Sequence, residues 1–166
     1  MSIYLVVPLL VVVGLLQTAL MPHLALWGVF PDLPILVVAS WGLLRGPVEG
    51  SLWGFIAGVT IDLFSGGPFG AATLSLVIVG LLAGLGKASA LHSNITLPVL
   101  VVFLVTIIHN LIYLLVLQIS GLNVTWLESL WRITLLSAAL NALLTPPIFW
   151  FMRWTYIRFH GKEMEI

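Results

Sequence analysis

Residues Gly50–Gly70, GSLWGFIAGVTIDLFSGGPFG, combine an apolar helical stretch, one acid and a glycine-rich turn. Glycines recur every four residues at Gly50, Gly54 and Gly58, and Asp62 continues the same spacing. Four residues advance a helix by about 400°, so the stripe drifts by only about 40° at each step and the glycines share one face. This spacing predicts a groove in which another backbone packs closely.

The composition of the whole chain indicates what surrounds this helix. Of the 166 residues, 61% are hydrophobic and 7% are charged, which is too little polar surface to coat a soluble globule. Six basic and six acidic residues give a net charge of zero, and cysteine is absent. We therefore expect a single all-α polytopic membrane domain that has no disulfides and no basic patch for nucleic acid.

Prolines, glycines and polar clusters divide the chain into six apolar segments, which predict six transmembrane helices. Their approximate bounds are 3–20, 33–44, 48–64, 71–86, 96–119 and 127–150, and residues 151–166 are expected to form a cytoplasmic basic tail. The second segment reaches only about 18 Å, which is short of the roughly 30 Å of hydrocarbon. Either Arg45 snorkels to extend this span, or part of residues 22–32 re-enters the membrane.

The basic residues predict the orientation of the helices. Arg45 lies in the connection between the second and third segments and is assigned with Glu49 to a cytoplasmic loop. Lys87 lies between the fourth and fifth segments, and three more basic residues lie in the tail. The positive-inside rule places these connections and both termini in the cytoplasm, with Arg132 as the exception. The first segment has no basic region before it and no cleavage pattern after it, so we interpret it as a retained helix.

Asp62 and Arg132 are both unfavourably placed for their own helices. An acid in the last turn of a helix opposes the macrodipole, and so does a base in the first turn. Because the two residues are expected at a similar depth, we favour an ion pair between them. Two alternatives stay open: Glu128 holds Arg132 within one helix turn, and Asp62 caps the amides of Gly70 and Ala71.

A second glycine pair, Gly80 and Gly84, gives the fourth helix a groove like that of the third. In one interpretation the third and fourth helices pack against each other through these small residues. In the other, one of the two grooves receives a helix from a partner protein. The glycines of both helices are therefore predicted to form a helix-packing or partner interface.

Polar residues at membrane depth are few, namely Gln17, Thr106, His109, Asn110 and Asn141. Our first interpretation is hydrogen bonding between helices, worth about 0.6–2 kcal/mol each, and the alternative is a ligand pocket. The histidines are isolated, and neither an HExxH motif nor a nucleophile elbow is present. We predict no catalytic residues, no metal site and no cofactor.

The stretch PDLPILVVASWGLLRG at Pro31–Gly46, followed by Gly50–Gly70, resembles the signature half of the MreD family of bacterial rod shape-determining proteins. The positions that carry the resemblance are Pro31, Arg45, Gly50, Gly54, Phe55, Gly58, Asp62, Gly66 and Gly70. The resemblance covers residues 31–86 closely, and the remainder by length, six spans and a basic tail. It implies a non-enzymatic, multi-pass scaffold subunit in the bacterial cytoplasmic membrane, with a role in cell elongation and peptidoglycan synthesis.

The same resemblance implies the partners. These are a bitopic MreC-like protein, the polymerase and transpeptidase of the elongation complex, and indirectly the actin-like MreB. The family fold is also similar to the S-components of energy-coupling transporters, which gives an alternative function. Such a protein binds a vitamin-like ligand under its outer loops, where this chain offers Trp27, Asp32, Asn123 and Trp126.

Overall fold

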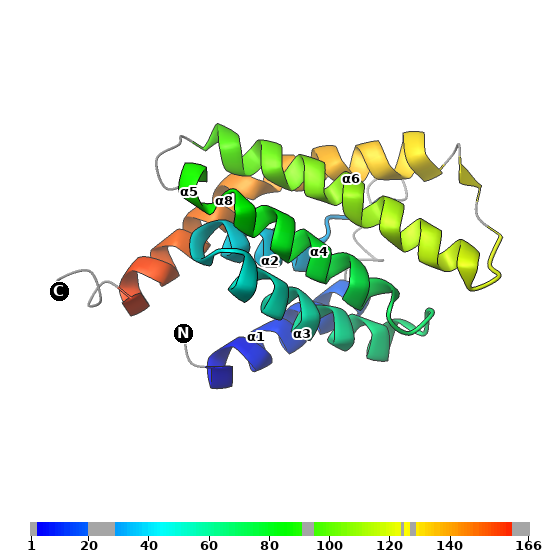
Figure 1. Cartoon of the computed structure of the whole chain (residues 1–166), viewed down its shortest axis with the longest axis horizontal. Coiled ribbons are helices and arrows are strands. Elements are labelled where there is room, and N and C mark those ends of the chain that lie inside the picture. Colours follow the sequence, from blue (N-terminus) through cyan, green and yellow to red (C-terminus); the bar gives the residue numbers. More distant parts are fainter. Residues whose placement is uncertain (1–2, 20–28, 91–94, 124, 127–128, 161–166) are drawn as a thin grey trace.

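A computed structural model describes residues 3–19, 29–90, 95–123, 125–126 and 129–160 of the chain. These residues form an all-helical bundle with the elements α1 (Ile3–Ala19), α2 (Leu33–Arg45), α3 (Pro47–Ser65), α4 (Ala71–Leu85), α5 (Lys87–Ala90), α6 (Thr96–Ile119), the π-helical η2 (Ser129–Thr134) and α8 (Leu135–His160). The long helices alternate in direction, so α1 begins at the end of the bundle where α8 finishes (Figure 1). We call this end, which contains Arg45 and Lys87, the basic end, and the opposite end the distal end.

The first five predicted segments agree with the observed helices to within one residue, whereas the last helix extends beyond its predicted end at residue 150 into residues 151–160 of the predicted tail. These residues continue α8 as helix. Phe151 stacks with Trp154 at 6.3 Å between ring centroids, and the Arg158 guanidinium lies 5.5 Å from the centre of the Trp154 ring. Such contacts at three- and four-residue spacing stabilise a helix. Residues 161–166 lie outside the described part of the chain.

Helix α2 is the centre of the bundle. It contacts α1, α3, α4, α6 and α8, and all of its residues from Pro34 to Leu44 are buried. A helix covered on every side by protein has no lipid-facing surface, so the bilayer does not set its length. This explains its 13 residues without snorkelling by Arg45. Most of the predicted re-entrant segment falls on residues 20–28, outside the described residues.

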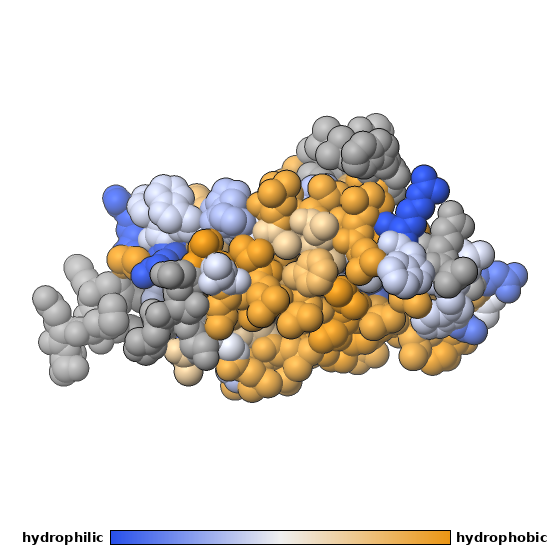
Figure 2. All heavy atoms as spheres, turned by 90° about the horizontal axis from the view of Figure 1, so that it is seen from above, coloured by the Kyte–Doolittle hydropathy of each residue, from blue (hydrophilic) through white to orange (hydrophobic). Residues whose placement is uncertain are grey.

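The surface of the bundle has the apolar band that a lipid environment requires. On the face seen in Figure 2, hydrophobic residues form a continuous band between two ends where hydrophilic residues gather. Within the described part of the chain, two helices are long and apolar enough by length and composition to cross a membrane, and three further apolar helices are shorter. The two are Thr96–Ile119 and Ser129–Arg158, and the shorter ones are Val7–Ala19, Leu33–Arg45 and Ala71–Leu85. The count of six spans remains a prediction.

Candidate functional site

The glycine stripes of α3 and α4 face each other. A Cβ added at Gly54 lies 2.2 Å from the carbonyl oxygen of Leu76, and one added at Gly80 lies 2.0 Å from the carbonyl oxygen of Gly50. Real Cβ atoms essentially never approach another heavy atom within 3.0 Å. Backbone therefore touches backbone along this contact, which we call the α3–α4 seam.

The remaining predicted glycines lengthen the seam. An added Cβ at Gly58 lies 2.3 Å from the Cα of Thr73, and one at Gly84 lies 2.3 Å from the Cα of Pro47. Close approach of backbones is how helices gain van der Waals contact where lipid removes the hydrophobic driving force. The five predicted glycines thus hold α3 to α4 within the chain. No space is left at these described positions for the helix of a partner.

Asp62 joins the two helices at the distal end of the seam. Its carboxylate accepts hydrogen bonds from the backbone N–H groups of Gly70, Ala72 and Thr73, each at 3.0 Å, and from the Thr73 hydroxyl at 2.6 Å. The acid therefore lies in the last turn of α3 but occupies the positive N-terminal pole of α4. This pole compensates for the unfavourable end of its own helix. The capping alternative therefore describes Asp62, but only one of its two expected partners, Gly70, is observed. Ala72 and Thr73 supply the other N–H groups, and the Ala71 N–H donates to the Pro68 carbonyl at 3.2 Å instead.

The predicted pair of Asp62 with Arg132 is not among the ion pairs that the structure shows between its described residues. Both carboxylate oxygens of Asp62 are directed to α4 instead. Arg132 lies in η2, at the start of the last long helix. Its other predicted partner, Glu128, lies outside the described residues, so that alternative stays a prediction.

The connection between α2 and α3 is a single residue, Gly46. Its φ of 106° lies in the left-handed region that favours glycine. Across this turn Arg45 and Glu49 form a two-pronged ion pair, with Nε at 2.8 Å and Nη2 at 2.6 Å from Glu49 Oε1. The two residues were expected in a loop, but they belong to the last turn of α2 and the first turn of α3.

Aromatic residues surround this ion pair at the basic end. Trp41 donates its indole N–H to Glu49 Oε2 at 3.3 Å and stacks on Trp53 with ring centroids 4.3 Å apart. The Arg45 guanidinium lies 5.8 Å from the centre of the Tyr156 ring on α8. The cluster therefore ties α2, α3 and α8 together, which is a structural role.

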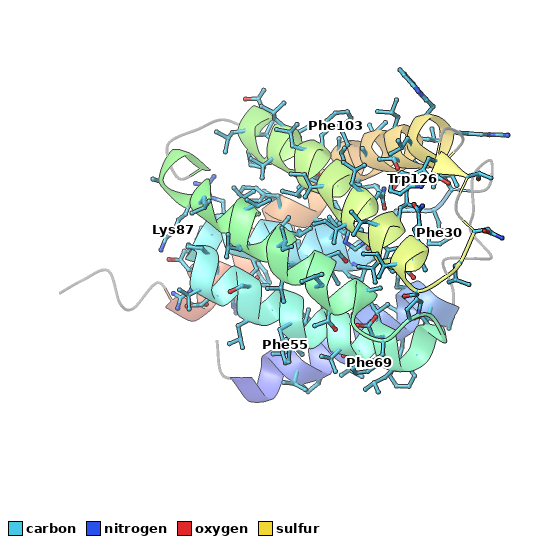
Figure 3. All side chains as sticks on the ribbon, turned by 45° about the vertical axis from the view of Figure 1, so that its right-hand side comes forward. Phe30, Phe55, Phe69, Lys87, Phe103 and Trp126 are labelled. Carbon is cyan, nitrogen blue, oxygen red and sulfur yellow. The ribbon has the colours of Figure 1, made fainter. Side chains whose placement is uncertain are left out.

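A cavity of about 480 Å³ opens at the distal end, and we call it the distal cavity. Figure 3 shows Phe30, one of its lining residues, and Trp126 at this end, opposite Lys87. Its described walls come from the ends of α1 and α3, the first turns of α4 and α8, the second half of α6, η2 and the residues before α2. The polar lining residues are Gln17, Thr18, Asp32, Ser65, His109, Asn110, Tyr113, Ser129, Thr134 and Ser137.

Two of the membrane-depth polar residues bind the backbone before α2. The Gln17 side chain donates to the Pro31 carbonyl at 3.3 Å and accepts from the Leu33 N–H at 3.0 Å. Asn141 accepts from the Asp32 N–H at 2.8 Å and donates to the Thr106 hydroxyl at 3.3 Å. For Gln17, Thr106 and Asn141, the interpretation as hydrogen bonding between segments is therefore confirmed.

The other two, His109 and Asn110, are different. His109 Nδ1 and Asn110 Nδ2 are buried and have no hydrogen-bond partner among the described residues. His109 Nε2 lies 3.9 Å from Asp32 Oδ2, and its ring stacks on Tyr113 with centroids 6.1 Å apart. Both residues line the distal cavity, so the pocket interpretation applies to them.

Of the four residues named for a vitamin site, two do not line the distal cavity. Asp32 lines the distal cavity, but Asn123 and Trp126 are not among its lining residues, and Trp27 lies outside the described part of the chain. Trp126 instead donates to the side chain of Gln118. Sequence reasoning missed the serines and threonine that η2 and α8 add to the wall, because polar residues at a helix start usually read as caps.

Comparison with known proteins places the chain in a family. Residues 1–155 match the family model of the rod shape-determining protein MreD. No curated protein and no solved structure matches the chain. The match takes in the α3–α4 seam, the Asp62 cap, the distal cavity and nearly all of α8. The chain therefore belongs to the MreD family of rod shape-determining membrane proteins.

Proposed function

We propose that this protein is a non-enzymatic scaffold subunit of the bacterial machinery for cell elongation and peptidoglycan synthesis. The observation that carries the proposal is the family match over residues 1–155. The structure adds support, because several of its polar residues join helices, as in the Asp62 cap and the Asn141 bridge. Among the described residues, no three metal-binding side chains form a group.

Its partners are a bitopic MreC-like protein, the elongation polymerase and transpeptidase, membrane lipid and, indirectly, actin-like MreB. Because the glycine grooves are filled within the chain, we place the partner contacts on the outer, apolar surface of the bundle. Helix α6 supports this location, since Leu100, Leu104 and Leu115 are each about half exposed along its length. Shape complementarity between such a surface and a partner helix is the main attraction available in lipid.

The protein is proposed to cross the bacterial cytoplasmic membrane six times with both termini in the cytoplasm. The support is that Lys87, which donates to the Arg45 carbonyl at 3.1 Å, lies at the end of the bundle where α1 also starts (Figures 1 and 3). Alkaline phosphatase and a fluorescent protein, fused separately to the C-terminus, test this orientation. We expect fluorescence without phosphatase activity, and active phosphatase would contradict the proposal.

Depletion in the native host tests the scaffold role. Rod-shaped cells should become round or swollen, and an MreC-like protein should co-purify with the tagged chain from native membranes. Normal morphology after complete loss, in a host without a second copy, would contradict the role. Co-purification of a transporter ATPase module, with unchanged shape, would instead support the vitamin-binding alternative, for which the distal cavity is the favouring observation.

A further inference from the structure

Unpartnered polar atoms concentrate at the distal cavity. Three buried side-chain atoms of described residues have no hydrogen-bond partner: Ser40 Oγ, His109 Nδ1 and Asn110 Nδ2. Two of the three belong to consecutive residues of α6 that both line the cavity. Each buried group without a partner costs about 1–3 kcal/mol. Two such groups beside one hollow are what a site completed by a ligand presents.

Loose packing of the whole region does not explain these atoms. One helix turn before Asn110, the Thr106 hydroxyl is fully bonded, donating to the Val102 carbonyl at 2.7 Å and accepting from Asn141 at 3.3 Å. In the opposite wall, Thr134 donates to the Ser129 carbonyl at 3.0 Å. Groups around the cavity are therefore satisfied where protein partners exist. His109 and Asn110 differ because they line the same cavity without such a partner for Nδ1 and Nδ2.

The two free atoms define a hydrogen-bonding pattern. Asn110 Nδ2 is a donor, so a ligand must offer an acceptor to it. The Asp32 carboxylate 3.9 Å from His109 Nε2 favours the tautomer with the proton on Nε2, which leaves Nδ1 as an acceptor. A ligand must then offer a donor to Nδ1. A carboxamide or a hydroxyl group supplies both a donor and an acceptor within a few ångströms.

The charges around the cavity favour an uncharged ligand. No lysine or arginine is among the described lining residues, so an anion would meet Asp32 without a compensating cation. Asp32 is itself held at the positive start of α2, where its side chain accepts from the Ile35 N–H at 3.3 Å, and it faces His109. Its carboxylate thus already has polar partners within the chain. Burying an unpaired charge is far costlier than burying a bonded neutral group.

The volume of the distal cavity and its apolar lining residues indicate the size and polarity of the rest of the ligand. A volume of about 480 Å³ falls within the range of small-molecule pockets. The apolar lining residues are Val29, Phe30, Ile61, Phe64, Leu114, Leu117 and Ile133. We propose that the distal cavity binds an uncharged molecule with an apolar body and a carboxamide or hydroxyl group, which bridges His109 and Asn110. This inference holds whether or not the protein acts as a scaffold.

Matched neutral and anionic probes test the proposal on the full chain in nanodiscs. Indole-3-acetamide and indole-3-acetate differ mainly in charge and represent a ligand from water. Monoolein and oleate represent a ligand from the bilayer. Apparent affinities come from the rise in thermal unfolding midpoint with probe concentration, because a ligand that binds only the folded state stabilises it. We expect at least one neutral probe to bind about tenfold or more tightly than its anionic twin.

Variants connect this binding to the two side chains. Asn110→Leu keeps a similar volume and removes the donor, and should weaken the neutral probe about tenfold, as the loss of one hydrogen bond implies. Should Asn110→Leu not yield monodisperse protein, His109→Phe replaces it, with the same expected loss. Ser120→Ala, on an exposed residue at the end of α6, should bind as the original chain does.

Each outcome decides the question. Binding of the acetamide, of monoolein or of both supports the site, and the pair that responds identifies the source as water, bilayer or either. Equal binding of the anionic twins overturns the proposal, and so does the absence of any response to both neutral probes. Unchanged binding in Asn110→Leu and His109→Phe would show that the probes bind elsewhere and would overturn it too.

Discussion

The α3–α4 seam and the distal cavity lie next to each other but are packed in opposite ways. In the seam, backbones approach so closely that the Gly54, Gly58, Gly80 and Gly84 positions have no room for a methyl group. In the cavity, about 480 Å³ is left open beside two unsatisfied polar atoms. Ala72 belongs to both regions, because its N–H bonds to Asp62 while the residue lines the cavity.

The difference teaches which part of the bundle is committed to holding the fold. Helices in lipid associate through close packing and satisfied polar groups, since lipid tails are as apolar as leucine. The seam has both features and therefore serves stability. At His109 and Asn110 the cavity has neither close packing nor satisfied polar groups. Such a local exception to the packing rules is expected where a residue serves function rather than stability.

The largest expected effect is that of added volume in the seam. Gly54→Leu should abolish folded protein, because even its Cβ must lie 2.2 Å from the Leu76 carbonyl oxygen unless α3 and α4 separate. Overpacking costs about 1–3 kcal/mol or more, and backbone cannot move aside like a side chain. Size-exclusion profiles in detergent measure it. Gly67→Ala, whose added Cβ meets Tyr113 Oη at 3.4 Å and Ser65 Oγ at 3.7 Å, is the control. A stable, monodisperse Gly54→Leu protein would show that the seam is not tight.

The next effect concerns the cap at the distal end of the seam. Asp62→Ala leaves the N–H groups of Gly70, Ala72 and Thr73 without their acceptor, and should lower the free energy of unfolding by about 2–3 kcal/mol. The loss for Asp62→Asn should be smaller than that for Asp62→Ala, since the amide oxygen of asparagine can still accept a hydrogen bond. Unfolding in denaturant measures both.

A double-mutant cycle with Arg132→Gln separates capping from the ion pair favoured by sequence. Because the Asp62 oxygens are occupied by α4, the effects should add to within about 0.5 kcal/mol. A coupling well above this would restore the pair.

A smaller effect is expected at the basic end. Glu49→Gln removes the charge opposite Arg45 but keeps an acceptor for the Trp41 indole N–H. Because 36% of the Glu49 side chain is exposed, solvent screening reduces the loss to about 0.5–1 kcal/mol. The loss should shrink further at high salt, which unfolding at two ionic strengths detects. A salt-independent loss would mean that packing, not charge, holds this turn.

The smallest effect sharpens the comparison most. Ser137→Leu adds carbon atoms as Gly54→Leu does, but into the distal cavity. We expect the free energy of unfolding to change by less than about 1 kcal/mol in either direction, since filling a void avoids the cost of overpacking. The thermal midpoint checks this. A loss as large as that of Gly54→Leu would show that the hollow is absent in the folded protein.

The glycine faces that form the seam and most helix bounds were predictable from sequence, because both depend on residues that are close together along the chain. Glycines at four-residue spacing must share a face, and breakers end helices wherever the fold puts them. The hydrogen-bond partners of Asp62 were harder to predict from sequence. Arg132 was suggested because its expected depth in the membrane is similar to that of Asp62, but depth alone does not say which helices are neighbours. The cap depends instead on how residues 66–70 turn the chain back onto α3.

The cavity and the central position of α2 were not predictable for a related reason. The sequence names His109, Asn110 and Asn141 as polar residues at depth, but the rotation of each helix decides which of them finds a protein partner. Likewise, the number of residues in α2 shows that this helix is shorter than the hydrocarbon layer is thick. Only the arrangement of the surrounding helices shows that α2 has no contact with lipid.

The one-residue joint at Gly46 has a consequence for how the chain enters the membrane. Because no loop separates them, we expect α2 and α3 to be inserted together, with the turn held by Arg45 and Glu49 forming during insertion. We expect them to enter as a hairpin, with α2 protected by α3 until α4 and α6 arrive. Lengthening the joint with glycine and serine residues should allow α2 and α3 to insert separately. The labelling of single cysteines placed along α2, in chains stalled on the ribosome, would measure this. Protection of α2 in chains that end at Gly46 would rule out the hairpin.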